Sequence, residues 1–202
     1  MKVAALYVER GGPYFTMSDV DPWDKERDAR LYAGPLPVVA HPPCGPWGCL
    51  SHFYQGAEHD CGPAAVRAVQ KWGGVVEHPA YSKLWRVMRL PFPGEFTDEH
   101  GGFTLAVEQV SWGHVARKRT WLYVVGVPRA IALAGVRTGG TPTHWVHKHR
   151  RRGDGSAVRI PDGIKSCSQE LRRRTPPAFA AWLVDLARAA TVTRDFVALE
   201  AG

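Results

Sequence analysis

The sequence predicts an α/β fold, a mostly parallel sheet flanked by helices, in a single domain spanning residues 1–202. Four short runs rich in apolar and β-branched residues predict strands, and they lie at 3–8, 38–40, 75–77 and 119–127. Two longer stretches, 62–72 and 175–186, carry apolar residues at helical spacing. Strands that alternate with helices favour parallel pairing, because each crossover returns the chain to the same edge of the sheet. The 202 residues are 45% hydrophobic and 22% charged, which is typical of a globular domain.

The first elements are delimited by glycine and proline. The strand at 3–8 stops at Gly11-Gly12-Pro13, which cannot extend it. The acids and turn formers of 19–24 predict a turn, followed by a short helix. The next strand, at 38–40, stops at the Pro42-Pro43 pair, because proline lacks the N–H that a sheet ladder needs.

The middle of the chain predicts a helix, a strand and a second helix. Pro63 lies in the first turn of the helix at 62–72, and Gly73-Gly74 ends it. The apolar run at 75–77 then predicts the third strand, and 82–88 a short helix.

The C-terminal part predicts a strand, a long loop and a helix. Residues 103–110 form a strand or a short helix, and 119–127 is the strongest strand of the chain because it is rich in β-branched and aromatic residues. Residues 128–174 are loop-rich and basic. Thr175 then predicts the N-cap of a helix whose apolar residues share one face.

The loop after the strand at 38–40 presents a cysteine, Cys44, directly behind the Pro42-Pro43 pair. In open α/β sheets, ligands bind at the carboxyl ends of the strands. A thiol on a stiff loop at that edge is how a thiolate nucleophile would be displayed. The alternative is a small buried residue in a proline-rich turn, which is the usual environment of a free cysteine.

Other reactive side chains fall at the ends of the following strands. Glu77 and His78 close the third strand, and Lys118 and Arg119 come just before the strand at 119–127. A thiol, a carboxylate and cations gathered at one sheet edge would form a site for attack on an electrophilic ring.

The net positive charge of the chain lies in one segment. Between Arg137 and Arg174, ten Lys or Arg residues face three acids, which equals the formal net charge of +7 of the whole chain. This segment includes Trp145, Lys148 and the run Arg150, Arg151 and Arg152. Segregated basic charge beside an aromatic residue favours binding to the nucleic-acid backbone. The alternative is a solvated loop that keeps the protein soluble.

Four segments together resemble the cytosine-5 DNA methyltransferases. Pro42-Pro43-Cys44 and the residues after it resemble the catalytic Pro-Pro-Cys loop, and Glu77-His78-Pro79 resembles the Glu-Asn-Val that ends the family's next strand. Residues 111–126 are similar to the Gln-x-Arg-x-Arg segment that feeds an apolar strand, and 175–179 to a Thr-Pro helix near the end of such domains. The resemblance implies a Rossmann-like, methyltransferase-type sheet.

The resemblance also implies a reaction: transfer of a methyl-type, one-carbon group to carbon 5 of cytosine in DNA. The Cys44 thiolate would add to carbon 6 of a flipped-out cytosine, Glu77 would bind the Watson–Crick edge, and a cation from Lys118 or Arg119 would hold the O2 edge. The catalytic residues implied in this way are Cys44, Glu77 and Lys118. The residues implied to bind the substrate are Pro43, His78, Arg119 and Thr120. The basic insertion at 128–174 takes the place of the family's target-recognition region and would be a reduced DNA reader.

The family's donor is S-adenosylmethionine, and Asp21 or Asp24 would hold its ribose hydroxyls. The chain departs from the family at the glycine-rich cofactor loop, where Gly11 and Gly12 come late. His78 also stands where the family has Asn. A modifier that uses another donor therefore remains an alternative, as does a relative that only binds DNA or a nucleotide.

Two further classes compete with this interpretation. Six potential zinc ligands lie within 21 residues, namely His41, Cys44, Cys49, His52, His59 and Cys61. They lack the His-x-Glu and Pro-Cys-x-x-Cys spacing of zinc nucleobase deaminases, so no metal is predicted, although a structural zinc site stays open. The other class is a DNA-binding module without chemistry, with Trp112 and Trp145 as stacking platforms.

Cysteine usage and hydropathy predict a cytoplasmic protein. Four cysteines in a chain of this size do not make a disulfide scaffold, and no apolar run approaches the length of a membrane span. The first residues resemble a buried strand rather than a signal peptide. By analogy, the small size and basic segment suit a phage or mobile-element modification protein.

Overall fold

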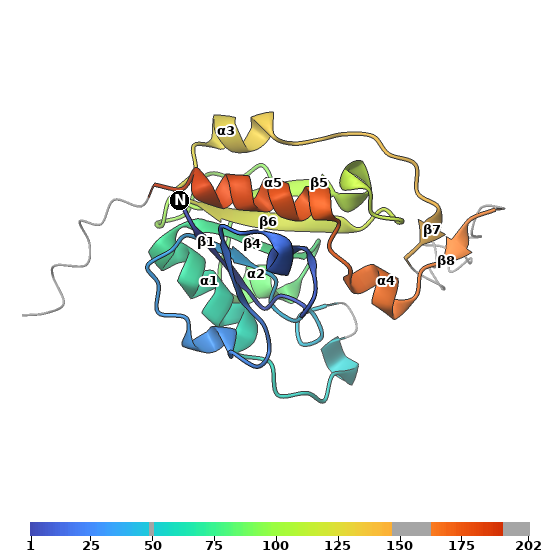
Figure 1. The fold of residues 1–202 in the computed structure, drawn as a ribbon, viewed down its shortest axis with the longest axis horizontal. Coiled ribbons are helices and arrows are strands. Elements are labelled where there is room, and N and C mark those ends of the chain that lie inside the picture. Colours follow the sequence, from blue (N-terminus) through green and yellow to red (C-terminus); the bar gives the residue numbers. More distant parts are fainter. Residues whose placement is uncertain (49–50, 147–162, 192–202) are drawn as a thin grey trace, which may run out of the picture.

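The computed structural model describes residues 1–48, 51–146 and 163–191, and shows an α/β fold built on a six-stranded sheet (Figure 1). The strands lie in the order β2-β1-β3-β4-β6-β5. Their bounds are β1 Val3–Leu6, β2 Val20–Trp23, β3 Val38–Ala40, β4 Gly74–Pro79, β5 Phe103–Glu108 and β6 Arg119–Val125.

The sheet is mostly parallel, with one strand reversed. β1 pairs in parallel with β2 and β3, and β3 with β4, whereas β6 runs antiparallel to both β4 and β5. The start of β6 therefore lies at the same edge as the carboxyl ends of β3 and β4. This reversal brings the residues before β6 to the edge that carries the cysteine loop.

Helices cover both faces of the sheet. The α-helices are α1 Cys61–Trp72, α2 Lys83–Val87, α3 Arg129–Ala134, α4 Gln169–Arg173 and α5 Pro177–Arg188. The 3₁₀ helices are η1 Pro13–Thr16, η2 Ala29–Leu31, η3 Ser51–Phe53 and η4 Gln109–Trp112. α5 packs on β1, β3 and β4, and α1 packs against β3, β4 and β6 from the opposite side (Figure 1).

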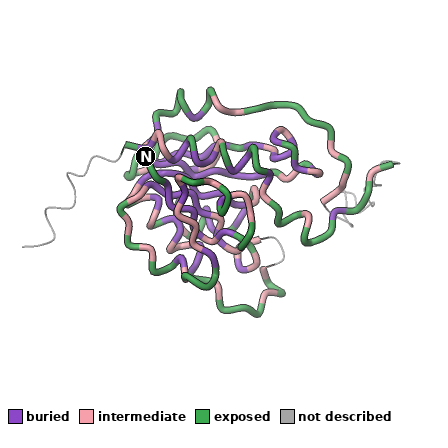
Figure 2. The backbone as a smooth tube through the Cα atoms, in the orientation of Figure 1, coloured by how far each residue is buried: buried purple, intermediate pink, exposed green. Residues whose placement is uncertain are grey.

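Burial follows this layering. Each face of the sheet has its own apolar cluster, one beneath α5 and one beneath α1 and α2, and the strands between them are buried (Figure 2). Gly74, at the start of β4, has φ +119°, and a Cβ there would lie 2.0 Å from the carbonyl oxygen of Val38. The close approach of β3 and β4 therefore requires glycine at this position.

The prediction of a turn at 19–24 is wrong, because residues 20–23 form β2. Asp21 and Pro22 resemble turn residues, but β2 is an edge strand with one unpaired side, where proline is tolerated. The predicted N-cap role of Thr175 is also wrong: Pro176 occupies that position and makes no side-chain capping bond.

The segment 128–174 is less irregular than the sequence predicts. It contains α3, α4 and two short paired strands, β7 His144–Trp145 and β8 Lys165–Ser166. β7, β8 and α4 project beyond the sheet at the end away from the N-terminus (Figure 1). Residues 147–162 lie outside the described part of the chain.

Candidate functional site

The loop after β3 exposes the thiol of Cys44. Two backbone amides close the turn, because Trp47 N and Gly48 N donate to the Cys44 carbonyl at 3.1 and 2.8 Å. Lys83 N donates to the Trp47 carbonyl at 2.9 Å and ties the loop to α2. A Cβ at Gly45 would lie 2.5 Å from the Tyr54 ring, so the cysteine loop packs closely against this tyrosine. The loop therefore holds an exposed thiol on a supported turn.

Glu77, on the neighbouring strand β4, is buried and held at both oxygens. His41 Nδ1 lies 2.9 Å from Oε2, and Gln109 Nε2 donates to Oε1 at 2.9 Å. Lys118 Nζ lies 3.9 Å from Oε1. Burial alone would raise the pKa of Glu77, but the Lys118 charge and the His41 contacts outweigh it and lower that pKa to about 2. Glu77 is therefore an ionised carboxylate in a buried site.

The contacts continue on both sides of Glu77. The Tyr14 hydroxyl, from η1, lies 2.6 Å from His41 Nε2. On the other side, Gln109 Nε2 also donates to Thr120 Oγ1 at 3.0 Å. We call Tyr14, His41, Glu77, Gln109 and Thr120 the Glu77 network. It joins η1, the end of β3, β4, η4 and β6 at one sheet edge.

His78 lies on the other face of β4 from Glu77. It shares that face with Val76, which packs in the cluster beneath α1, whereas Val75 and Glu77 face α5. The ring is fully buried, and burial lowers the pKa of His78 to about 4 against the opposing effects of Glu77 and the Pro43 backbone. Because His78 and Glu77 are adjacent in β4, their side chains lie on opposite faces of the sheet and are not brought together around one ligand.

The two cations before and at the start of β6 have different neighbours. Lys118 reaches Glu77, while Arg119 is exposed and lies 3.4 Å from Glu108. Thr120 is fully buried within the Glu77 network. The sequence offers Lys118 or Arg119 as the cation for the O2 edge of cytosine. The structure places Lys118, and not Arg119, beside the Glu77 carboxylate.

The two candidate cofactor-binding acids also differ. Asp21 lies inside β2, and its oxygens accept from Arg27 at 2.6 Å and from Trp23 Nε1 at 2.8 Å. Asp24 directly follows β2, at the edge that carries the cysteine loop. Its Oδ1 accepts from the backbone amides of Glu26 and Arg27, and its Oδ2 has a distant ion pair with Arg10 at 3.6 Å. Asp24 Oδ2 therefore accepts no hydrogen bond from the described residues, whereas both oxygens of Asp21 do.

The described part of the basic segment attaches directly before Lys118. Thr143 N and His144 N both donate to the Val115 carbonyl at 2.9 Å, and His114 Nε2 lies 3.1 Å from the carbonyl of Leu171 in α4. Of the predicted DNA-binding residues, Trp145 is half-buried in β7. The others, Lys148, Arg150, Arg151 and Arg152, lie outside the described residues.

Trp112 is not a stacking platform. Its ring is buried and stacks on Trp182 of α5 at 4.6 Å between centroids, with Phe179 at 5.2 Å. The three rings fasten α5 to η4, so Trp112 has a packing role.

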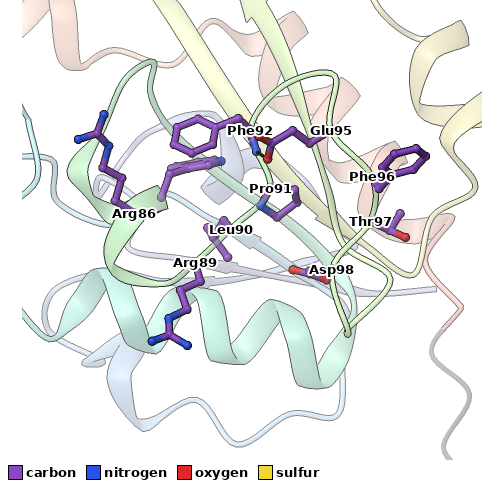
Figure 3. Close-up of a pocket in the computed structure, with 10 residues that line it drawn as sticks. Arg86, Arg89, Leu90, Pro91, Phe92, Glu95, Phe96, Thr97 and Asp98 are labelled. Atoms are coloured by element: carbon purple, nitrogen blue, oxygen red, sulfur yellow. Dashed lines mark hydrogen bonds between the residues drawn. The ribbon is translucent and has the colours of Figure 1, made fainter.

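The surface of the described residues includes two hollows of similar size. One, of about 440 Å³, lies beside α2 and the loop that follows it (Figure 3). This hollow shares no residue with the Glu77 network. The Glu95 carboxylate in its wall accepts a hydrogen bond from the Phe92 amide at 2.6 Å. The other, of about 410 Å³, includes Arg119, Thr120 and Tyr81 in its wall and adjoins the network at Thr120. The second hollow is therefore the one next to the candidate site.

No three His, Cys, Asp or Glu side chains converge as a metal centre would require within residues 1–48, 51–146 and 163–191. Cys49 lies outside these ranges. No helix in the described part of the chain is both long and apolar enough to span a membrane.

Sequence reasoning did not single out three members of the Glu77 network. Gln109 and Tyr14 gave no signal, because neither belongs to a recognisable motif and each is brought to Glu77 only by the fold. His41 was considered solely as a potential zinc ligand. Its position directly before Pro42-Pro43 was the available signal, since parallel pairing places the end of β3 beside the end of β4.

Searches for similar proteins found no matching family model, no matching curated protein and no matching solved structure.

Proposed function

We propose that this protein is a DNA-modifying transferase of Rossmann-like, methyltransferase type, which adds a one-carbon group to carbon 5 of cytosine. One observation carries the proposal: an exposed thiol, a buried ionised carboxylate and a lysine are brought to one sheet edge by three neighbouring strands. Cys44 follows β3, Glu77 lies in β4, and Lys118 precedes the reversed strand β6. These are the groups that nucleophilic attack on a pyrimidine needs.

In the proposed reaction the Cys44 thiolate forms a bond to carbon 6 of the cytosine ring. The electron pair of the 5,6 double bond makes carbon 5 nucleophilic, and charge that develops on the ring is stabilised at its Watson–Crick edge. Glu77 accepts a hydrogen bond from the exocyclic amine and, once N3 has taken up a proton, from N3–H, and the Lys118 ammonium faces O2. After the one-carbon group has joined carbon 5, a base removes the carbon-5 proton, the carbon–sulfur bond breaks, and the thiolate is restored.

The residues near the carboxyl ends of β1 and β2 fit S-adenosylmethionine, which supplies a methyl group when bound. Asp24 offers an oriented carboxylate for ribose hydroxyls, because its Oδ1 is fixed by two backbone amides while Oδ2 has only the distant Arg10 partner. In the loop after β1, Gly11 has φ +73° and open space where a Cβ would lie, so a ligand can approach the backbone.

DNA is the proposed partner because of where the basic segment is attached. Its described residues bond to Val115 and His114, within a few residues of Lys118. A DNA strand bound along this segment would therefore lie next to the edge that carries Cys44. A cytosine flipped out of such a strand would lie at this edge of the sheet.

The proposal is tested by trapping. Duplex DNA containing 5-fluorocytosine is incubated with the protein and S-adenosylmethionine, because fluorine cannot leave as a cation and the adduct persists. Wild-type protein is expected to form a denaturant-resistant adduct, Cys44→Ser to lose it, and the matched control Cys49→Ser to keep it. Nucleoside mass spectrometry of DNA from expressing cells should show cytosine heavier by one methylene. An adduct that survives in Cys44→Ser would refute the proposal.

A further inference from the structure

We infer that His41 is a proton-relay residue: through Glu77 it supplies the proton that the pyrimidine takes up when Cys44 adds to the ring. The inference rests on the proposed function and adds to it the source of the proton. His41 lies between Tyr14 and Glu77 in one line of hydrogen bonds, 2.6 Å from the tyrosine hydroxyl and 2.9 Å from the carboxylate.

Glu77 cannot supply this proton by itself. Addition of a thiolate to carbon 6 pushes charge onto the ring, and N3 is the atom that takes up a proton. Glu77 is ionised, since Lys118 and His41 hold its pKa at about 2 despite burial. A carboxylate only accepts hydrogen bonds, so a proton must reach it from a neighbour before it can donate to N3.

His41 is the neighbour able to do so. Gln109 donates to Oε1 but cannot release its amide proton, whereas an imidazolium can give up the Nδ1 proton directed at Oε2. Each carboxylate oxygen has two lone pairs, so Oε2 can hold the contact with His41 and still address the substrate. The side chains of His41 and Glu77 are 11% and 7% exposed, which keeps bulk water from competing as the proton source.

Tyr14 determines the direction in which the His41 ring can release a proton. Burial and the nearby Glu77 charge raise the pKa of Tyr14 well above its usual value, so its hydroxyl stays protonated. It can accept a hydrogen bond from Nε2–H but cannot be the destination of a proton from the ring. The proton can therefore leave only from Nδ1, toward Glu77. The hydroxyl also fixes the plane of the ring, which the transfer requires.

The charged and titratable groups around His41 come from three elements. Tyr14 belongs to η1, Glu77 and His78 to β4, and Lys118 precedes β6. His78 has its pKa lowered to about 4 by burial and is therefore neutral at physiological pH.

The step balances in atoms and charge. As the bond from Cys44 Sγ to carbon 6 forms, N3 takes a proton from Glu77, and Glu77 takes one from His41 Nδ1. The adduct then contains neutral His41 and ionised Glu77. When the carbon–sulfur bond breaks, N3 returns the proton through Glu77 to His41. No oxidant, reductant or other reactant is needed.

The test uses exchange of the cytosine carbon-5 hydrogen with solvent, which requires Cys44 addition but no methyl donor. His41→Asn keeps an amide donor where Nδ1 stood but cannot carry a proton. We expect exchange in this variant to fall by about a hundred- to ten-thousand-fold, the range for loss of general acid–base catalysis, with DNA affinity unchanged. Any decline of the wild-type exchange rate toward alkaline pH should be absent from this variant. His100→Asn, in an exposed loop, is the control and should match wild type.

The outcomes separate the two proposals. His41→Asn with a wild-type rate and pH profile would overturn the relay and leave the proposed function standing, the more so if His41→Ala were impaired, because the role would then be structural. Wild-type protein without exchange on any cytosine-containing DNA would overturn the proposed function and the relay with it, since no other acceptor for the proton is proposed.

Discussion

At the scale of single residues, the candidate site depends on how a buried carboxylate is kept charged. Burying an ionised group costs several kcal/mol unless partners compensate for the lost water. Glu77 has three partners, His41, Gln109 and Lys118, each from a different part of the chain. The buried charge of Glu77 therefore costs free energy of folding but provides a carboxylate for chemistry. Perturbed pKa values of this kind are common at functional sites.

Glu77→Gln should therefore impair both reaction and stability, in a pH-dependent way. Because the folded-state pKa of Glu77 is lowered from 4.5 to about 2, its ionisation stabilises the fold above pH about 4.5, and this contribution is lost as the pH falls toward 2. The variant should be less stable than wild type at pH 7, by up to about 3 kcal/mol. Urea unfolding between pH 7 and pH 3 should show this difference shrinking. Turnover should drop by about a hundred- to thousand-fold.

The exposed glutamate Glu99 offers the matched control for this change. Its side chain is 89% exposed, so Glu99→Gln should leave stability within about 0.5 kcal/mol of wild type at each pH. A stability loss in Glu77→Gln that stays constant from pH 7 to pH 3 would show that the carboxylate charge is not what the fold uses.

Residue by residue, the sequence predicted the reactive groups better than their partners. Cys44 and Glu77 were found because Cys44 follows one apolar strand and Glu77 lies near the end of the next, and strand ends of a parallel sheet share an edge. Gln109 and Tyr14 were missed because their role is a hydrogen bond between distant segments, which no local spacing encodes. Placing His78 with the substrate overlooked strand alternation, since adjacent residues in β4 face opposite sides of the sheet.

At the scale of elements, the reversed strand β6 builds the site. Had β6 run parallel to β4, Lys118 would lie at the opposite edge from Cys44. The sequence located this strand, but not its direction, because a run of β-branched and aromatic residues pairs either way. It missed β2 for the opposite reason: Asp21 and Pro22 are poor strand residues whose place at the sheet edge is set by tertiary packing.

Another element-scale feature, the attachment of α4, can be tested at His114. His114 Nδ1 lies 3.0 Å from Ala116 N and 2.9 Å from the Ala116 carbonyl, and its Nε2 is within hydrogen-bond distance of the Leu171 carbonyl, at 3.1 Å. His114→Ala should remove this bond, worth about 1–3 kcal/mol where a buried group loses its partner. Hydrogen exchange of residues 165–174 should then speed up by about five- to 150-fold, with the amides of β4 and β6 unchanged.

The exposed His100 again gives a matched control, and His100→Ala should leave the exchange of residues 165–174 as it is in wild type. Equal protection in His114→Ala and wild type would mean that α4 is held by its other contacts. The region before Lys118 and the basic segment would then not be coupled through this histidine.

At the scale of the whole molecule, the chain separates its core from its charge. The sheet and the helices beside it contain most of the buried residues, whereas the residues of β7, β8 and α4 are half-buried or exposed (Figure 2). The net charge of +7 comes entirely from 137–174, so the remaining residues sum to zero. The sequence predicted this division, because charge is counted from composition and needs no knowledge of packing.

This division predicts how DNA affinity responds to salt. Each phosphate neutralised by a cation releases condensed counterions and adds about 0.9 to the negative slope of log affinity against log salt. Replacing Arg150, Arg151 and Arg152 with Ala should therefore lower that slope by up to about 2.7, with weaker binding to every duplex sequence. The free energy of unfolding should be almost unchanged.

The matched control replaces three exposed cations of α1 and α2, Arg67, Lys71 and Arg86, and removes the same charge from another surface. Fluorescence anisotropy across a salt series measures both variants. Equal slopes in the two would show that net charge alone attracts DNA. An unchanged slope in the first variant would make 137–174 a solubilising segment and free nucleotides the better substrate candidates.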